Sequence, residues 1–215
     1  QICRRGYRVT DIETGDELQV DNKYIMSPKD LKTIHFLNKM IDAGVRVFKI
    51  EGRARGPEYV ALTVRAYSEA IQAICDGTYS DEMIDRWDTS LSRVFNRGFW
   101  DGYYMGQRLG EWSSKYGSSA TKVKRYIAKG VRYFPRLGVG EFLMEAGELH
   151  PDDEIVITGT DTGAIIMKAG ELRLDYDPVP VVTKGQSFSL RVPRKIRPSD
   201  RMYLWQDTTP SDPKS

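Results

Sequence analysis

The sequence predicts an α/β part followed by an all-β part, and two patterns carry this prediction. Up to about residue 78, short β-rich runs alternate with runs whose apolar residues recur every three or four positions, which is typical of parallel β/α units. From about residue 122 the apolar residues alternate with polar ones, in short runs between turn residues. We therefore predict three regions, at residues 1–78, 79–121 and 122–215.

The first region has the order strand, helix, strand, helix. The two predicted strands are β-rich runs at residues 24–26 and 45–50. The two predicted helices each begin at a proline and end at a glycine, from Pro28 to Gly44 and from Pro57 to Gly77. Because a parallel sheet needs more than two strands, we expect this region to be an incomplete fold by itself.

The second and third regions are predicted to differ in secondary structure. Residues 79–121 are expected to hold one helix, with apolar residues from Ile84 to Val94, and then an aromatic connector at residues 95–104. Many short strands between Gly, Pro, Asp and Thr residues predict a small closed β-barrel in the third region. The candidate strands are residues 122–133, 139–144, 154–157, 164–167, 187–192 and 202–204.

Composition narrows the class of protein. The chain is 40% hydrophobic and 29% charged, which fits a globular protein, and a net charge of +2 is weak evidence for a nucleic-acid partner. No apolar run approaches the roughly 20 residues of a membrane-spanning helix, so no membrane is expected.

The chain opens with neither Met nor an apolar leader, which predicts that it begins inside a longer protein. Cys3 and Cys75 form no disulfide framework, which predicts the cytoplasm, and Cys75 is expected to be a buried small hydrophobe.

The segment around the second predicted strand is the strongest candidate for chemistry. Alternation in a strand would place Lys49 and Glu51 on the face opposite Phe48 and Ile50, at the C-terminal mouth of a barrel. Arg53 and Arg55 would follow on the loop just above that mouth. A structural Lys–Glu pair is the alternative, but an interior ion pair costs several kcal/mol of desolvation per charge, which favours a functional site.

Two other patterns leave the function open. A peptidase needs a nucleophile with a base in reach, and the chain has two histidines, His35 and His150, with no metalloprotease or nucleophile-elbow motif around them. The third region interleaves cations with rings, which suits RNA because cations contact phosphates and rings stack on bases, although a solvated strand face is the alternative. The candidates for RNA contact are Lys122, Lys124, Arg125 and Tyr126.

Several stretches together resemble peptidase family U32, the collagenase-like peptidases. Residues 24–31, 43–45 and 48–53 are similar to the last β/α units of the family's barrel, and residues 57–61, Tyr67 and 96–99 fit the same pattern. The third region, above all residues 151–159, is similar to the family's C-terminal β-barrel, which resembles the second domain of translation GTPases. The resemblance implies a TIM-like β/α barrel whose upstream half belongs to the same protein, followed by a small β-barrel.

The resemblance also implies several activities. Family members include peptidases of unknown mechanism and proteins that resemble hydroxylases of tRNA, of ribosomal RNA or of the ubiquinone ring, with prephenate as oxygen donor in the RNA branch. We therefore expect a prephenate-linked RNA base hydroxylation enzyme that acts on tRNA or ribosomal RNA. Glu51 and Lys49 would be its catalytic residues, and Arg53 and Arg55 would bind a small anionic substrate. The alternatives are a peptidase, or a non-catalytic peptide- or RNA-binding module, and the chain by itself is expected to be inactive.

Cys3 resembles the end of the family's cysteine motif. It is a weak candidate for a metal ligand, with partners upstream of this chain. Val60 stands where members with a four-cysteine iron–sulfur cluster have a cysteine, so a cluster of that kind is not expected. The identity of any other cofactor is left open by the sequence.

Overall fold

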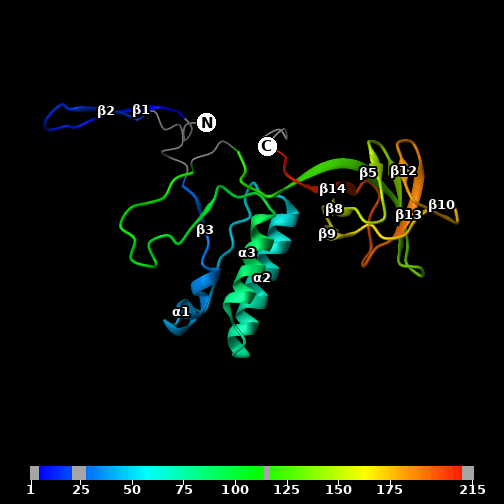
Figure 1. Ribbon diagram of the computed structural model, residues 1–215, viewed down its shortest axis with the longest axis horizontal. Coiled ribbons are helices and arrows are strands. Elements are labelled where there is room, and N and C mark those ends of the chain that lie inside the picture. The colour runs from blue at the N-terminus through cyan, green and yellow to red at the C-terminus, as the bar shows by residue number, and fades with distance from the viewer. Residues whose placement is uncertain (1–4, 21–27, 114–116, 210–215) are drawn as a thin grey trace. The chain divides into compact units, whose positions relative to one another are not determined.

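The computed structural model describes residues 5–20, 28–113 and 117–209, and these divide into two units (Figure 1). Unit 1 contains residues 1–49 and 66–120 as far as they are described, and unit 2 contains residues 50–65 and 121–209. Helix α2 (Pro57–Cys75) therefore contributes its first turns to unit 2 and the rest to unit 1. No helix in the described ranges has both the length and the apolar composition needed to cross a bilayer.

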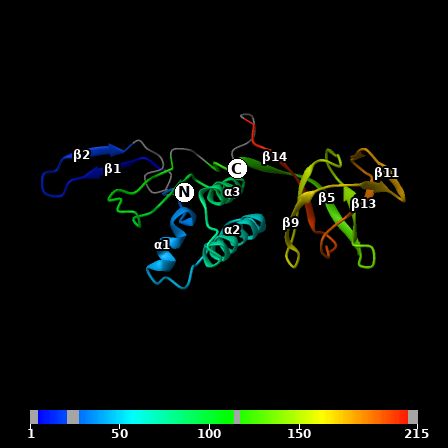
Figure 2. The ribbon, with the colours of Figure 1, turned by 60° about the horizontal axis from the view of Figure 1, so that its bottom comes forward.

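Unit 1 is built on helices packed around a small apolar core. A single 3₁₀ turn (Ile34–Phe36) leads into α1 (Leu37–Asp42), and α2 lies beside α3 (Asp81–Ser92) in both views (Figures 1 and 2). Small side chains on α2 allow this close approach, and Trp87 of α3 fills the space while its Nε1 donates to Glu69 at 2.9 Å. The buried members of the core are Ile34, Leu37, Ala66, Ala70, Ala73, Trp87 and Leu91.

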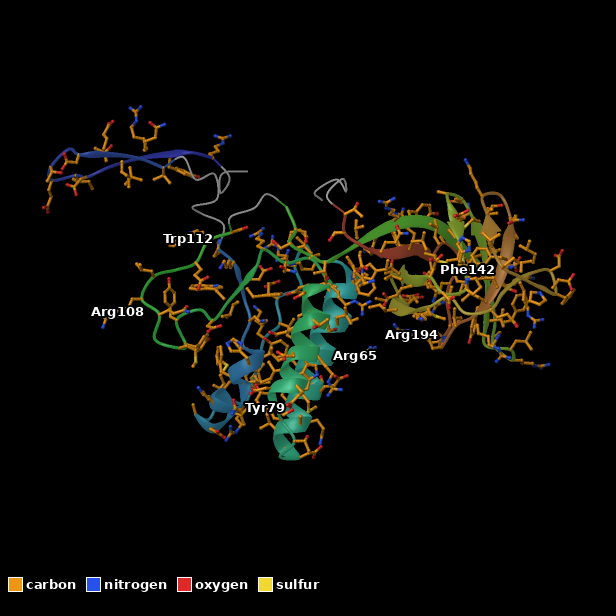
Figure 3. All side chains as sticks on the ribbon, in the orientation of Figure 1. Arg65, Tyr79, Arg108, Trp112, Phe142 and Arg194 are labelled. Carbon is orange, nitrogen blue, oxygen red and sulfur yellow. The ribbon has the colours of Figure 1, made fainter. Side chains whose placement is uncertain are left out.

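Short strands complete unit 1. Strands β1 (Tyr7–Thr10) and β2 (Glu17–Val20) form an antiparallel hairpin, and β3 (Asp30–Leu31) pairs in parallel with β4 (Phe99–Trp100). Figure 3 shows Arg108 and Trp112 on the loop that follows β4. Lys29 joins this loop to the start of β3, because its amide donates to the carbonyl of Glu111 and its ammonium lies 2.5 Å from the Glu111 carboxylate.

Unit 2 is dominated by one antiparallel sheet of eight strands in the order β11-β10-β13-β6-β5-β14-β8-β9. A separate pair is formed by β7 (Glu148–Leu149) and β12 (Val182–Thr183). The sheet strands are β5 (Lys122–Phe134), β6 (Val139–Met144), β8 (Glu154–Gly159), β9 (Gly163–Lys168), β10 (Leu172–Leu174), β11 (Asp177–Val179), β13 (Ser187–Arg191) and β14 (Arg201–Asp207).

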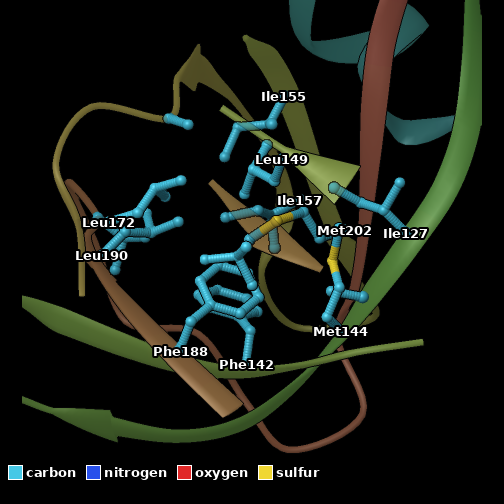
Figure 4. Packing of buried hydrophobic residues seen from close by; sticks show 14 of the residues in the cluster. Ile127, Phe142, Met144, Leu149, Ile155, Ile157, Leu172, Phe188, Leu190 and Met202 are labelled. Atoms are coloured by element: carbon cyan, nitrogen blue, oxygen red, sulfur yellow. The ribbon is translucent and has the colours of Figure 1, made fainter. Parts of the chain in front are cut away.

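The core of unit 2 lies against one face of this sheet (Figure 4). Alternate residues of β6 and β13 point into it, and the rings of Phe142 and Phe188 stack with their centroids 5.7 Å apart. Both rings are almost fully buried, as are Leu149 and Leu172. The other face of β13 is polar, with Ser187, Ser189 and Arg191, whereas that of β6 carries Glu141 between the apolar Val139 and Leu143.

Most elements with strong local signals are confirmed. Helix α2 begins at Pro57 as predicted and stops before Gly77, whose φ of 68° is the left-handed conformation that ends helices. Helix α3 and all six candidate strands of the third region are present, with small shifts at their ends. The predicted strand at residues 24–26 lies outside the described residues.

Other predictions are wrong. The helix expected from Pro28 begins only after Thr33, because residues 30–31 extend to pair with β4. Residues 45–50 form no strand, so the TIM-like β/α barrel is not confirmed. The eight-stranded sheet is open and not a closed barrel, since in the described residues β9 pairs with β8 alone and β11 with β10 alone. Cys75 is exposed because it lies on the solvent side of the last turn of α2.

Candidate functional site

The predicted catalytic segment folds as a tight loop in front of α2. The amide of Arg53 donates to Glu51 Oε1 at 2.7 Å, and the amide of Arg55 donates to the carbonyl of Gly52 at 3.0 Å. Ala54 has a φ of 57°, a left-handed conformation that costs a non-glycine residue about 1–2 kcal/mol. Strain of this kind is held by the surrounding structure and is frequent at functional sites.

Two of the three charged side chains of this loop are exposed. Glu51 and Arg53 are exposed, while Arg55 is half-buried with its guanidinium 5.4 Å from the centroid of the Tyr59 ring. Arg53 has no carboxylate partner among the residues that the structure describes. The loop can therefore offer an unpaired guanidinium, a second guanidinium oriented by a ring, and one carboxylate to a ligand.

Lys49 belongs to unit 1 and is also exposed. The preceding Phe48 packs on the helical core of that unit, as predicted for the apolar side of this segment. Since residues 45–50 are not in a sheet, the alternation predicted to direct Lys49 and Glu51 to one face is not imposed by strand pairing here. Their catalytic role stays a prediction.

Glu58, two residues into α2, is the acidic residue of this region that sequence reasoning missed. Its carboxylate folds back over Gly56, where a Cβ would lie only 2.3 Å from Oε1, so a side chain at position 56 would displace the carboxylate. The side chain is 12% exposed, and Oε1 lies 2.8 Å from Nζ of Lys124, while the buried Oε2 accepts no hydrogen bond. An acidic residue in the first turn after a proline was the available signal, since it complements the helix dipole.

The residues predicted to contact RNA are partly occupied by other partners. Besides its pairing with Glu58, Lys124 lies with Nζ 5.0 Å from the centroid of the Tyr203 ring. Lys122 lies with Nζ 3.0 Å from Glu154 and 3.3 Å from Asp207. A phosphate would have to compete with these carboxylates, so both lysines are weaker phosphate donors than their spacing suggested.

Arg125 and Tyr126 are exposed in the first half of β5. The Tyr126 hydroxyl donates to Glu145, and the tyrosine ring meets that of Tyr203 edge to face, with centroids 5.7 Å apart. Desolvation, followed by the hydrogen bond to Glu145, raises the pKa of Tyr126 to about 12. Hydrogen bonds from Lys129 and Tyr126 hold the pKa of Glu145 below its usual value.

The remaining candidates assemble no metal site in the described ranges. Cys3, the weak metal candidate, lies outside them, and within them no three His, Cys, Asp or Glu side chains are grouped as metal ligands. His35 lies 3.0 Å from Asp101, and His150 lies 3.4 Å from Glu148. Both histidines are thus engaged by carboxylates.

The sequence is similar to known proteins over most of its length. A model of peptidase family U32 matches residues 1–114. A protein of Porphyromonas gingivalis named collagenase is 64% identical over 203 residues, which is 94% of this chain and 49% of that protein. The tRNA hydroxylation protein P1 of Bacillus subtilis is 33% identical over 125 residues, which is 54% of this chain and 30% of that protein.

Among solved structures, the C-terminal domain of a U32 peptidase of Geobacillus thermoleovorans matches 37% of this chain and 98% of its own length, at 15% identity and a TM-score of 0.36. The chain spans about half the length of the collagenase of Porphyromonas gingivalis. The family model covers more than half of the 215 residues. The chain belongs to peptidase family U32.

Proposed function

We propose that this chain supplies part of the small-molecule site and part of the RNA contact of an enzyme that hydroxylates a base of tRNA or ribosomal RNA. The observation that carries the proposal is the strained loop at residues 51–55, which presents Glu51 and the unpaired Arg53 to solvent. The similarity to the tRNA hydroxylation protein of Bacillus subtilis supports the RNA substrate. An RNA substrate also fits the cytoplasm, the compartment predicted from the two cysteines.

The loop suits a dianionic oxygen donor such as prephenate. A guanidinium binds a carboxylate through two parallel hydrogen bonds, and within the described residues Arg53 has no carboxylate that would compete. Arg55, oriented by the Tyr59 ring, is the second cation. Glu51 is the group that can move a proton, because its Oε2 has no hydrogen-bond partner in the described ranges, whereas Oε1 accepts from the Arg53 amide.

The test uses the full-length protein in a strain that lacks the gene. Nucleoside mass spectrometry of tRNA and ribosomal RNA should show a hydroxylated base restored by the natural gene, but not by Glu51→Gln or Arg53→Ala. Arg86→Ala is the matched control, since Arg86 is an exposed arginine on α3, away from the loop in sequence. Unchanged nucleosides in the deletion strain would refute the proposal.

A collagenase activity is the second candidate, and the 64% identity to the Porphyromonas gingivalis protein favours it. In that case either histidine could serve as the base, since each has a carboxylate partner, Asp101 or Glu148, and a carboxylate partner orients a general base. Gelatin cleavage by the purified full-length protein, with Glu51→Gln as the variant, separates the two candidates. Cleavage with normal RNA nucleosides would favour the hydrolase.

A further inference from the structure

The loop that follows β4 in unit 1, residues 101–112, gathers exposed apolar side chains, and we call it the aromatic loop. Tyr103 and Tyr104 are 63% and 61% exposed, and Trp112 is 43% exposed. Leu109 of the same loop is exposed as well. Single exposed apolar side chains are common on protein surfaces, whereas three rings on one short loop mark a surface that binds another molecule.

Two of these rings are held in place by contacts within unit 1. The Tyr103 ring meets that of Trp100 edge to face, with centroids 5.3 Å apart. A Cβ at Gly110 would lie 3.2 Å from the Trp112 ring and 3.4 Å from the Tyr103 hydroxyl, so both side chains lie against this residue. Each ring keeps exposed surface beside its internal contact. Rings fixed in this way lose little conformational freedom when a ligand binds.

The unpaired charge of the aromatic loop is positive. Its two carboxylates are engaged, since Asp101 lies 3.0 Å from Nε2 of His35 and Glu111 lies 2.5 Å from Nζ of Lys29. Arg108 is exposed, and within the described ranges its guanidinium has no carboxylate partner (Figure 3). A free guanidinium on the same loop as exposed rings complements a ligand that combines anionic groups with flat aromatic ones.

Single-stranded RNA is the ligand with this combination. Every base has an aromatic face that can stack on a tyrosine or tryptophan ring, and every linkage carries a phosphate that a guanidinium can bind. A duplex offers its phosphates but not its base faces, because these are stacked inside the helix. The aromatic loop should therefore distinguish unpaired RNA from paired RNA.

We propose that the aromatic loop binds a single-stranded segment of RNA, with bases stacked on Tyr103 and Trp112 and a phosphate on Arg108. The inference rests on the proposed hydroxylation of an RNA base and adds the surface that holds the nucleotides around it. A base has to leave its stack before an enzyme reaches it, and stacking on protein rings compensates for the stacking that is lost. Lys122 and Lys124 offer no such compensation, since their ammonium groups already face carboxylates.

The test measures fluorescence anisotropy of the full-length protein with a labelled ten-nucleotide RNA that has no internal pairing, alone and annealed to its complement. We expect the single strand to bind more tightly than the duplex. Tyr103→Ala should weaken binding of the single strand roughly 5-fold or more, the effect of one stacked base. Tyr103→Phe keeps the ring and should keep the affinity. Tyr103→Leu keeps apolar bulk without the ring and should bind as weakly as Tyr103→Ala.

Arg108→Ala tests the phosphate contact. It should weaken binding and reduce the slope of log affinity against log salt by about 0.7, the value for one contact to a single strand. Tyr176→Ala and Arg86→Ala are the matched controls, since Tyr176 is 88% exposed in unit 2 and Arg86 is exposed on α3. Both controls should leave the affinity and the salt slope unchanged.

The proposal is overturned if single strand and duplex bind equally well, or if Tyr103→Ala and Arg108→Ala leave the affinity intact. It is also overturned if Tyr103→Leu binds RNA as the natural protein does, because the loop would then be an apolar docking surface that needs no stacking. Nucleoside analysis judges the proposed function separately. RNA binding that depends on Tyr103, in a protein that restores no hydroxylated base, would refute the hydroxylation alone.

Discussion

The carboxylate of Asp200 lies so close to Gly159 that a Cβ at position 159 would be 1.8 Å from Oδ1. Asp200 is 5% exposed, and its Oδ2 accepts from the Thr162 hydroxyl at 2.6 Å and from the Arg197 amide at 2.8 Å. The amide and carbonyl of Gly130 also bond to this turn. One buried carboxylate thus holds the β8–β9 turn and the turn before β14 together.

Gly159→Ala should therefore destabilise unit 2 by about 1–3 kcal/mol or more, because the new methyl group displaces the Asp200 carboxylate from its donors. Urea denaturation of the full chain gives the change. Gly6→Ala is the control, since its Cβ would meet only the carbonyl of Val20, at 3.4 Å. Equal stability of the two variants would contradict the close approach of Asp200 to Gly159.

The ion pair of Lys124 and Glu58 gives a second prediction. Lys124→Met should lower the free energy of unfolding by about 1–3 kcal/mol, because it leaves a largely buried carboxylate without its cation. Adding Glu58→Gln should recover part of that loss. A double-mutant cycle by chemical denaturation measures the coupling, and additive effects would show that the pair contributes nothing.

The raised pKa of Tyr126 predicts that the folded chain loses stability at high pH. Its folded pKa of about 12 lies above the ordinary tyrosine value of 10.0, so the unfolded chain loses this proton first as pH rises. The contribution is fully present below pH 10 and is lost as pH approaches 12. Denaturation midpoints should fall less steeply over this window in Tyr126→Phe than in the natural chain. Parallel pH curves would show that Tyr126 titrates normally.

The left-handed conformation of Ala54 predicts that one substitution raises stability and lowers activity. Ala54→Gly removes the penalty of a left-handed alanine and should raise the free energy of unfolding by up to about 1 kcal/mol. It should also lower the yield of hydroxylated base, because the loop that positions Glu51 and Arg53 becomes more flexible. Thermal denaturation and nucleoside analysis give the two readouts. A variant that is both less stable and fully active would refute this interpretation of the loop.

RNA binding by β5 is tested by salt dependence. Removal of one phosphate-binding cation should reduce the slope of log affinity against log salt by about 0.7–0.9. If Lys122 and Lys124 bind RNA despite their carboxylate partners, Lys122→Ala with Lys124→Ala should weaken tRNA binding and flatten this slope. Lys168→Ala with Lys184→Ala, at two exposed lysines elsewhere in unit 2, is the control. An unchanged slope would remove the RNA role from these two lysines.

Local signals in the sequence predicted the structure correctly where the conformation depends on adjacent residues. Pro57 and Gly77 bound a helix, and Ser80 caps the next one by accepting from the Met83 amide, because these effects depend on adjacent residues. Residues 45–50 have strand-like composition but form no strand, since a strand needs neighbours that the sequence pattern cannot supply.

In the candidate site, too, the sequence predicted what adjacent residues determine and missed what depends on residues far apart in the chain. The glycine and arginines of residues 51–55 marked a charged turn, and the structure contains one. The partner of Lys124 could not be foreseen, because Glu58 comes from a distant part of the sequence and meets it only in the folded unit. The short strands β7, β10, β11 and β12 were missed because two or three residues carry too little periodicity to detect.

The pairing of β5 with β14 has a consequence for how the protein is made. Lys122 at the start of β5 lies opposite Asp207 at the end of β14, and β14 is the strand that links β5 to β8. The ribosome therefore finishes nearly the entire sheet before its middle can be assembled. Contacts between such distant positions form slowly, so the middle of the unit 2 sheet should assemble only once β14 has been synthesised.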